Sequence, residues 1–86
     1  MPTIAMFLGI LISMNWNDHL PPHFYAWYQG QKAIFDIDGN ILEGELPHRI
    51  TRIISGWAAI HSDELAADWE AGRLGQEPFR IGGYER

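Results

Sequence analysis

Two histidines and an aspartate lie close together in one short segment of the chain. Asp18 directly precedes His19, and His23 follows four residues later. An imidazole is a general base near neutral pH and a metal ligand, and a neighbouring carboxylate can orient its ring. The residue types therefore allow two chemical functions, acid–base catalysis and metal ligation by two histidines and one carboxylate. A third interpretation is structural, with His23 capping a strand or bonding the backbone of a tight loop.

Two prolines, Pro21 and Pro22, separate these histidines. Each proline fixes its own φ angle and removes a backbone donor, and the residue before it is pushed toward extended conformations. The pattern predicts a stiff loop, in which a spacing of four carries no helical register. Two histidines and an aspartate also occur together often by chance, so we expect neither a metal nor a cofactor. The candidate catalytic residues are His19, His23 and Asp18.

Two arginines form a second candidate site. Arg49 and Arg52 lie three residues apart near the start of the expected helix, where both guanidinium groups could contact a phosphate. The alternative is a surface ion pair with a nearby acid such as Glu43 or Glu45, which would contribute little to stability.

Aromatic residues suggest a binding surface. Tyr25 and Trp27 alternate with Phe24 and Ala26, so the two pairs point to opposite faces of a strand. If no helix covers Tyr25 and Trp27, they are candidates for contact with a base or a partner protein. Otherwise they complete the core or sit in a dimer contact.

The first half of the chain, about 3–44, has the pattern of strands. A continuous apolar run over 3–8 indicates a buried strand, and residues 10–16 alternate between apolar and polar. Gly9 and Gly30 permit turns, and Asp38-Gly39 is a strong hairpin signal. Because short connections join only antiparallel strands, we predict a meander of four to five strands.

The second half, about 47–72, has the pattern of a helix that begins near Pro47. One apolar stripe runs along it, and its residues are Ile50, Ile53, Ile54, Trp57, Ile60, Leu65 and Trp69. A bend near His61 is expected if Ser62 or Asp63 caps a second helix. The pattern ends at Gly72 or Gly75, and the tail 76–86 should be irregular. The predicted fold is α+β, with an amphipathic helix or a bent helix pair on one face of the sheet.

Composition restricts the class of protein. The 86 residues correspond to a single domain, 1–86, and contain no cysteine, which excludes thiolate chemistry and fits a reducing cytoplasm. A net charge of −5 argues against a nucleic-acid binder driven by bulk charge and favours a basic partner. The apolar stretch 3–14 lacks a preceding cation and is too short to span a bilayer, so we expect no membrane association.

Several segments resemble domain-of-unknown-function family 4160, a family of small bacterial proteins. The segment from Asn17 to Phe24, with its Pro-Pro pair between histidines, is the most specific of them. The start Met1-Pro2-Thr3-Ile4, the junction 42–47 and a Trp-Ala-x-x-His-x-x-Glu-Leu-x-x-x-Trp pattern over 57–69 resemble it too. Family members often have a histidine where this chain has Tyr25 and an acidic residue where it has Trp27.

The resemblance implies a function in a protein pair. Such proteins are commonly found beside a second small domain, family 2442, in a toxin–antitoxin-like arrangement. We therefore expect a cognate small protein of that family as partner, and a homo-oligomer or RNA contact stays open. The alternative is a metal-independent ribonuclease toxin, with His19 and His23 as acid–base pair, Asp18 orienting a ring, and Arg49 or Arg52 stabilising phosphorane charge.

Overall fold

A computed structural model of the chain describes residues 2–16 and 18–83, so Asn17 and the last three residues of the predicted tail lie outside it. Within these residues five strands form one antiparallel sheet in the order in which they occur along the chain. The strands are β1 (Thr3–Phe7), β2 (Ile10–Ser13), β3 (His23–Tyr28), β4 (Gln31–Asp36) and β5 (Ile41–Gly44). The predicted meander is therefore confirmed.

Two of the hairpins turn through two residues that both have positive φ. In the β1–β2 turn the φ angles of Leu8 and Gly9 are 52° and 76°, and in the β3–β4 turn those of Gln29 and Gly30 are 47° and 79°. This conformation matches the right-handed twist of the flanking strands. The tight turn that the sequence predicted around Gly30 is present, and it fixes the register of β3 against β4.

Two helices follow the sheet, α1 (His48–Ile60) and α2 (Ser62–Arg73), as in the bent pair that the sequence predicted. The predicted cap is wrong, because His61 precedes α2 and makes no side-chain capping bond. Ile60 was assigned to the apolar stripe but is 69% exposed. The chain changes direction at His61, directly after α1 ends. Ile60, the last residue of α1, therefore does not continue the buried stripe of that helix. No described helix is long and apolar enough to cross a bilayer.

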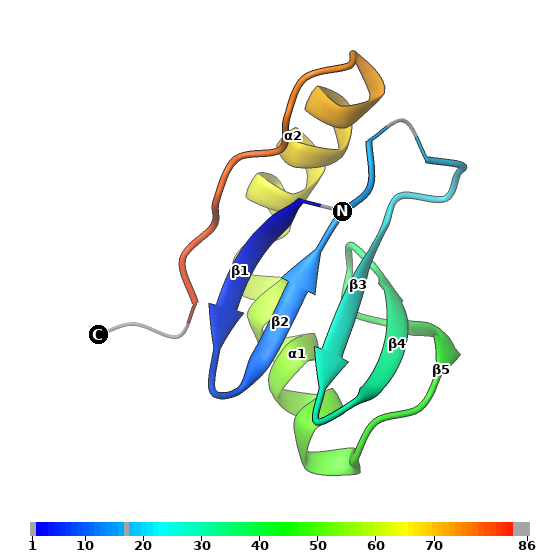
Figure 1. The fold of residues 1–86 in the computed structure, drawn as a ribbon, viewed down its shortest axis with the longest axis vertical. Helices are drawn as coiled ribbons and strands as arrows, with labels where there is room; N and C mark the ends of the chain where they lie inside the picture. The colour runs from blue at the N-terminus through cyan, green and yellow to red at the C-terminus, as the bar shows by residue number, and fades with distance from the viewer. Residues whose placement is uncertain (1, 17, 84–86) are drawn as a thin grey trace.

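The core lies between the sheet and the helices. Figure 1 shows α1 behind the sheet and α2 at the upper end of the strands, so the front face of the sheet carries no helix. Alternate residues of the strands point back to meet α1, and the fully buried side chains with the largest volumes include Trp57, Phe24, Phe35, Ile4, Ile10, Ile12 and Met14.

The C-terminal segment 76–83 has neither helix nor strand, as predicted, but it is held against the other elements. Figure 1 shows it descending beside β1. The Phe79 N–H donates to Asp68 Oδ1 at 2.8 Å, and the Ile81 N–H donates to the Ile4 carbonyl at 2.6 Å. Trp57 Nε1 donates to the Gly82 carbonyl at 2.9 Å. The segment thereby covers part of the β1 edge, which reduces edge-to-edge pairing with other chains.

Gly44→Ala is expected to destabilise the protein much more than Gly30→Ala. Both glycines have positive φ, +84° and +79°, so either alanine is strained. A Cβ on Gly44 would lie 2.5 Å from the Lys32 carbonyl oxygen, whereas a Cβ on Gly30 would meet no heavy atom within 4 Å. We expect losses of about 1 kcal/mol for Gly30→Ala and about 2–4 kcal/mol for Gly44→Ala in urea unfolding. Equal losses would mean that β5 moves away from β4 without cost.

Candidate functional site

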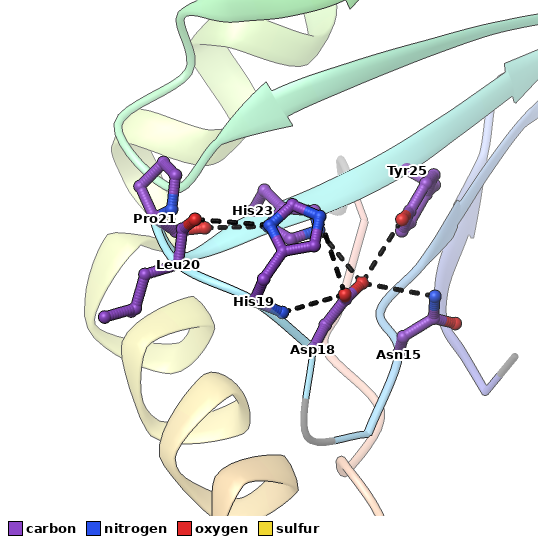
Figure 2. A network of polar contacts seen from close by, with 7 residues as sticks. All are labelled: Asn15, Asp18, His19, Leu20, Pro21, His23 and Tyr25. Atoms are coloured by element: carbon purple, nitrogen blue, oxygen red, sulfur yellow. Dashed lines mark hydrogen bonds and ion pairs between the residues drawn. The ribbon is translucent and has the colours of Figure 1, made fainter.

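The carboxylate of Asp18 is the centre of a polar cluster at one end of the sheet (Figure 2). Its Oδ1 accepts the backbone N–H of His19 at 2.8 Å. Its Oδ2 accepts Asn15 Nδ2 at 3.3 Å and the Tyr25 hydroxyl at 3.2 Å, and lies 3.1 Å from His23 Nε2. The loop between β2 and β3 supplies Asp18, and the adjoining strand β3 supplies Tyr25 and His23. The cluster thus connects the loop to the sheet.

His23 is held on every side. Its Nδ1 lies 2.7 Å from the Pro21 carbonyl oxygen, which only accepts, so Nδ1 carries a proton and Nε2 faces Asp18. The ring contacts those of Tyr25 and Trp69 at centroid distances of 5.5 and 5.2 Å. The side chain is only 3% exposed. Pro21 is part of the stiff loop that the sequence predicted, and its carbonyl orients the imidazole.

His19 lies over the ring of His23 and faces the solvent. The two imidazoles are stacked, with centroids 5.0 Å apart, and the His19 side chain is 79% exposed. Its Nδ1 lies 3.2 Å from the Leu20 carbonyl, and its Nε2 lies 3.8 Å from Asp18 Oδ1. His19 is therefore the member of the pair that solvent and solutes can reach.

Hydrogen bonds keep Asp18 ionised. Burial alone raises the pKa of this carboxyl, but the His19 backbone N–H and the side chains of Asn15 and His23 outweigh burial and lower the pKa below its ordinary value. Burial raises the pKa of Tyr25, and the neighbouring Asp18 charge raises it further. Tyr25 therefore stays protonated and acts as a donor to the carboxylate.

The structure brings together only part of the predicted set. Asp18, His19, His23 and Tyr25 meet at one place, whereas Trp27 lies two residues further along β3 with Lys32 Nζ 5.4 Å from its ring centroid. Arg49 and Arg52 lie in the first turns of α1. Figure 1 places the start of α1 at the opposite end of the molecule from the β2–β3 loop.

The arginines line a separate feature. With Ile53 they border a shallow hollow on α1. Within residues 2–16 and 18–83, the ion pairs involve neither Arg49 nor Arg52, so the predicted partners Glu43 and Glu45 are not used. Their positive charges remain available to a bound anion or partner.

Sequence reasoning missed two residues of the site. Asn15 was included only in the alternating strand predicted over 10–16, yet it follows the end of β2 and donates to Asp18. Trp69 was assigned to the core, where it is 8% exposed, but its ring also contacts His23. The proximity of Asn15 to Asp18 in the sequence was a weak signal. For Trp69 the sequence carried no signal, because only the packing of α2 against β3 brings it to the cluster.

Comparison with known protein families assigns the chain to one of them. A family model described as domain of unknown function DUF4160 matches residues 9–70. The chain belongs to the DUF4160 family. No curated protein and no solved structure matches the chain significantly. The DUF4160 match includes Asn15, Asp18, His23 and Trp69, whereas β1 and the segment 76–83 lie outside it.

The geometry of this DUF4160 protein limits the acid–base chemistry open to the cluster. A general base needs a ring nitrogen that a substrate can reach. Both nitrogens of His23 face protein acceptors and the ring is buried, so His19 Nε2 is the accessible imidazole nitrogen of the pair. Asp18 also presents an ionised carboxylate beside both rings (Figure 2), as a metal-ligating set would.

Proposed function

We propose that this protein is one component of a bacterial two-protein module of toxin–antitoxin type and acts in the cytoplasm by binding a cognate protein. The observation that carries the proposal is the face of the sheet that no helix covers in Figure 1. The aromatic side chains of this face, Tyr25 and Trp27, are half-buried. An apolar face that carries such residues is characteristic of protein–protein interfaces, whose strongest contacts are enriched in Trp and Tyr.

The register of the strands defines this outer face. Trp27 lies opposite Leu11 on β2 and Lys32 on β4, and Tyr25 lies opposite Ile34. Because side chains alternate along a strand, these residues point away from buried Phe24 and Ala26. Met6, which pairs with Leu11, extends the face onto β1 and is 60% exposed. We define the outer face as Met6, Leu11, Tyr25, Trp27, Lys32 and Ile34.

The partner that we propose is a small basic protein of family 2442. The family resemblance supports the identity of this partner, and the net charge of −5 supports its opposite charge. Lys32 Nζ lies 5.4 Å from the Trp27 ring centroid and 5.8 Å from that of Tyr25, so the cation and both rings form one continuous patch. The rings would enter an apolar pocket of the partner.

Trp27→Ala is expected to weaken binding of the family 2442 protein about thirtyfold or more, since a central interface tryptophan contributes about 2 kcal/mol or more. Calorimetry with both purified proteins measures the dissociation constant. Ile60→Ala is the matched control, because Ile60 is 69% exposed but belongs to α1 behind the sheet. Binding within about twofold of wild type is expected for this control.

Two results would contradict the proposal. One is that wild type does not bind the family 2442 protein, and the other is that Trp27→Ala binds it as tightly as Ile60→Ala does. Sedimentation of the protein alone completes the experiment. Self-association that Trp27→Ala abolishes would assign the outer face to a second copy of this chain instead.

The ribonuclease alternative stays a prediction. Exposure of His19 beside an ionised carboxylate supports it. It also requires a phosphate-binding cation near the imidazoles, and Arg49 and Arg52 belong to the start of α1, at the far end of the molecule from the β2–β3 loop (Figure 1). The interaction proposal needs no such rearrangement, which is why we favour it.

A further inference from the structure

The two imidazole rings of the polar cluster are oriented in a way that indicates a function separate from partner binding. Each ring has its Nδ1 next to a backbone carbonyl, that of Pro21 for His23 and that of Leu20 for His19. A carbonyl oxygen only accepts, so each Nδ1 carries a proton and each Nε2 is the remaining nitrogen. Figure 2 shows both rings beside the Asp18 carboxylate.

Each Nε2 faces an oxygen of that carboxylate. His23 Nε2 lies 3.1 Å from Oδ2 of Asp18, and His19 Nε2 lies 3.8 Å from Oδ1. The two rings are stacked with their centroids 5.0 Å apart, so both Nε2 atoms and the carboxylate lie on the same side of the loop. Two imidazole nitrogens and one carboxylate oxygen form a donor set that suits transition metals.

We propose that Asp18, His19 and His23 form a binding site for a divalent transition metal of the zinc class. One such ion satisfies both Nε2 lone pairs and the carboxylate together. The three ligand atoms lie within 4.8 Å of one another. Zinc holds nitrogen and oxygen ligands at about 2.0–2.2 Å, so tetrahedral ligand atoms are about 3.3 Å apart. His23 already has this spacing to Asp18, and the exposed His19 side chain can rotate to reach it.

The surroundings of these ligands resemble those of metal sites. A metal-bound histidine commonly donates its other N–H to a backbone carbonyl, as His23 does to Pro21. A ligating carboxylate is in turn hydrogen-bonded, as Asp18 is by Asn15 and Tyr25. With nitrogen and oxygen donors the site should prefer Zn²⁺ or Co²⁺ to Mg²⁺, and a fourth position is open to solvent on the side of His19.

Calorimetric titration of the full chain with ZnCl₂ tests the site. Wild type should bind one Zn²⁺ per chain and should give no binding heat with MgCl₂. His19→Ala and Asp18→Asn should each lower the Zn²⁺ affinity about tenfold or more. His48→Ala is the matched control, since His48 is exposed at the start of α1, and it should leave the affinity unchanged.

A second measurement on the wild-type protein does not depend on folding of the variants. In nitrogen-15 spectra of the imidazole rings, Zn²⁺ should shift Nε2 of His19 and His23 and leave His48 and His61 unmoved. His61 is a fair competitor because its Nδ1 contacts Glu64. Shifts confined to His48 or His61, absence of Zn²⁺ binding, or a His19→Ala variant with wild-type affinity would each overturn the proposal.

Discussion

Trp57→Ala is expected to remove a large part of the stability of the protein and to lower its melting temperature by more than about 10 °C. The Trp57 side chain is fully buried, and its ring contacts Phe7 and Phe24 at centroid distances of 5.2 and 5.8 Å. Removing a core tryptophan costs about 3–5 kcal/mol, and a chain of this length has a total stability of about 4–13 kcal/mol. Thermal melting followed by circular dichroism measures the loss.

Trp57→Phe separates packing from hydrogen bonding in this prediction. Phenylalanine keeps one aromatic ring in the core but cannot donate to the Gly82 carbonyl, as Trp57 Nε1 does at 2.9 Å. We expect Trp57→Phe to cost about 1–2 kcal/mol and to loosen the segment 76–83, measured as faster amide exchange at Ile81. A melting temperature of Trp57→Ala within a few degrees of wild type would contradict the central role of this ring.

The stability of the protein is expected to fall as the pH rises from about 4 to about 7, because of Asp68 on α2. This side chain is fully buried, its Oδ1 accepts the Phe79 N–H, and Oδ2 has no partner within the described residues. Burial raises the pKa of Asp68 to about 6, helped by the Glu64 charge and opposed by the Phe79 N–H. The folded protein therefore favours the protonated carboxyl.

The sign of this effect follows from linkage. Because the folded pKa of about 6 exceeds the ordinary value of 3.8, the stabilisation is complete below 3.8 and is lost as the pH rises through 6. Asp18 acts in the opposite direction, since its pKa is lowered and its stabilisation is lost only as the pH falls below the ordinary range. The two groups together place the stability maximum in the mildly acidic range.

Asp68→Asn isolates the contribution of this carboxyl. Asparagine keeps an oxygen for the Phe79 N–H and carries no charge, so at pH 8 the variant should be about 1–3 kcal/mol more stable than wild type. Near pH 4 this advantage should vanish. Urea unfolding across that pH range measures the difference, with the exposed Asp38→Asn as control. A stability difference between variant and wild type that is the same at every pH would mean that Asp68 does not change its protonation state between pH 4 and pH 8.

The outer face and the polar cluster are adjacent parts of one surface. Tyr25 belongs to both, because its ring lies beside Lys32 while its hydroxyl donates to Asp18. A partner bound over Trp27 would therefore lie close to the cluster. The binding experiments with the family 2442 protein and with Zn²⁺ are separate tests, and each can fail without the other.

Local patterns in the sequence were sufficient for the fold. The alternation of apolar residues over 10–16 indicated which side of β2 faces the core, and short turns at Gly9, Gly30 and Gly39 required antiparallel pairing. These features depend on neighbours along the chain. Helix ends were less well predicted: Pro47 precedes α1 instead of beginning it, and α2 starts without a side-chain cap.

The sequence predicted those members of the polar cluster that lie close together along the chain. Asp18, His19 and His23 are near in sequence, and the prolines between them indicated a stiff loop. The direction of each imidazole could not be predicted, because it depends on which carbonyl oxygen lies beside each Nδ1. The sequence also could not show that Arg49 and Arg52 lie away from the cluster. Their position relative to it depends on the path of the chain through β4 and β5.

The sequence by itself determined the antiparallel sheet, a helical second half and a loop with two histidines and a carboxylate, because each follows from contacts between near neighbours in the chain. Only the tertiary structure decided that Trp69 packs on His23, that Asp68 is buried without a partner for Oδ2, and that the C-terminal segment is held against β1. Those contacts join residues far apart in the chain, and their energies depend on burial that no local pattern encodes.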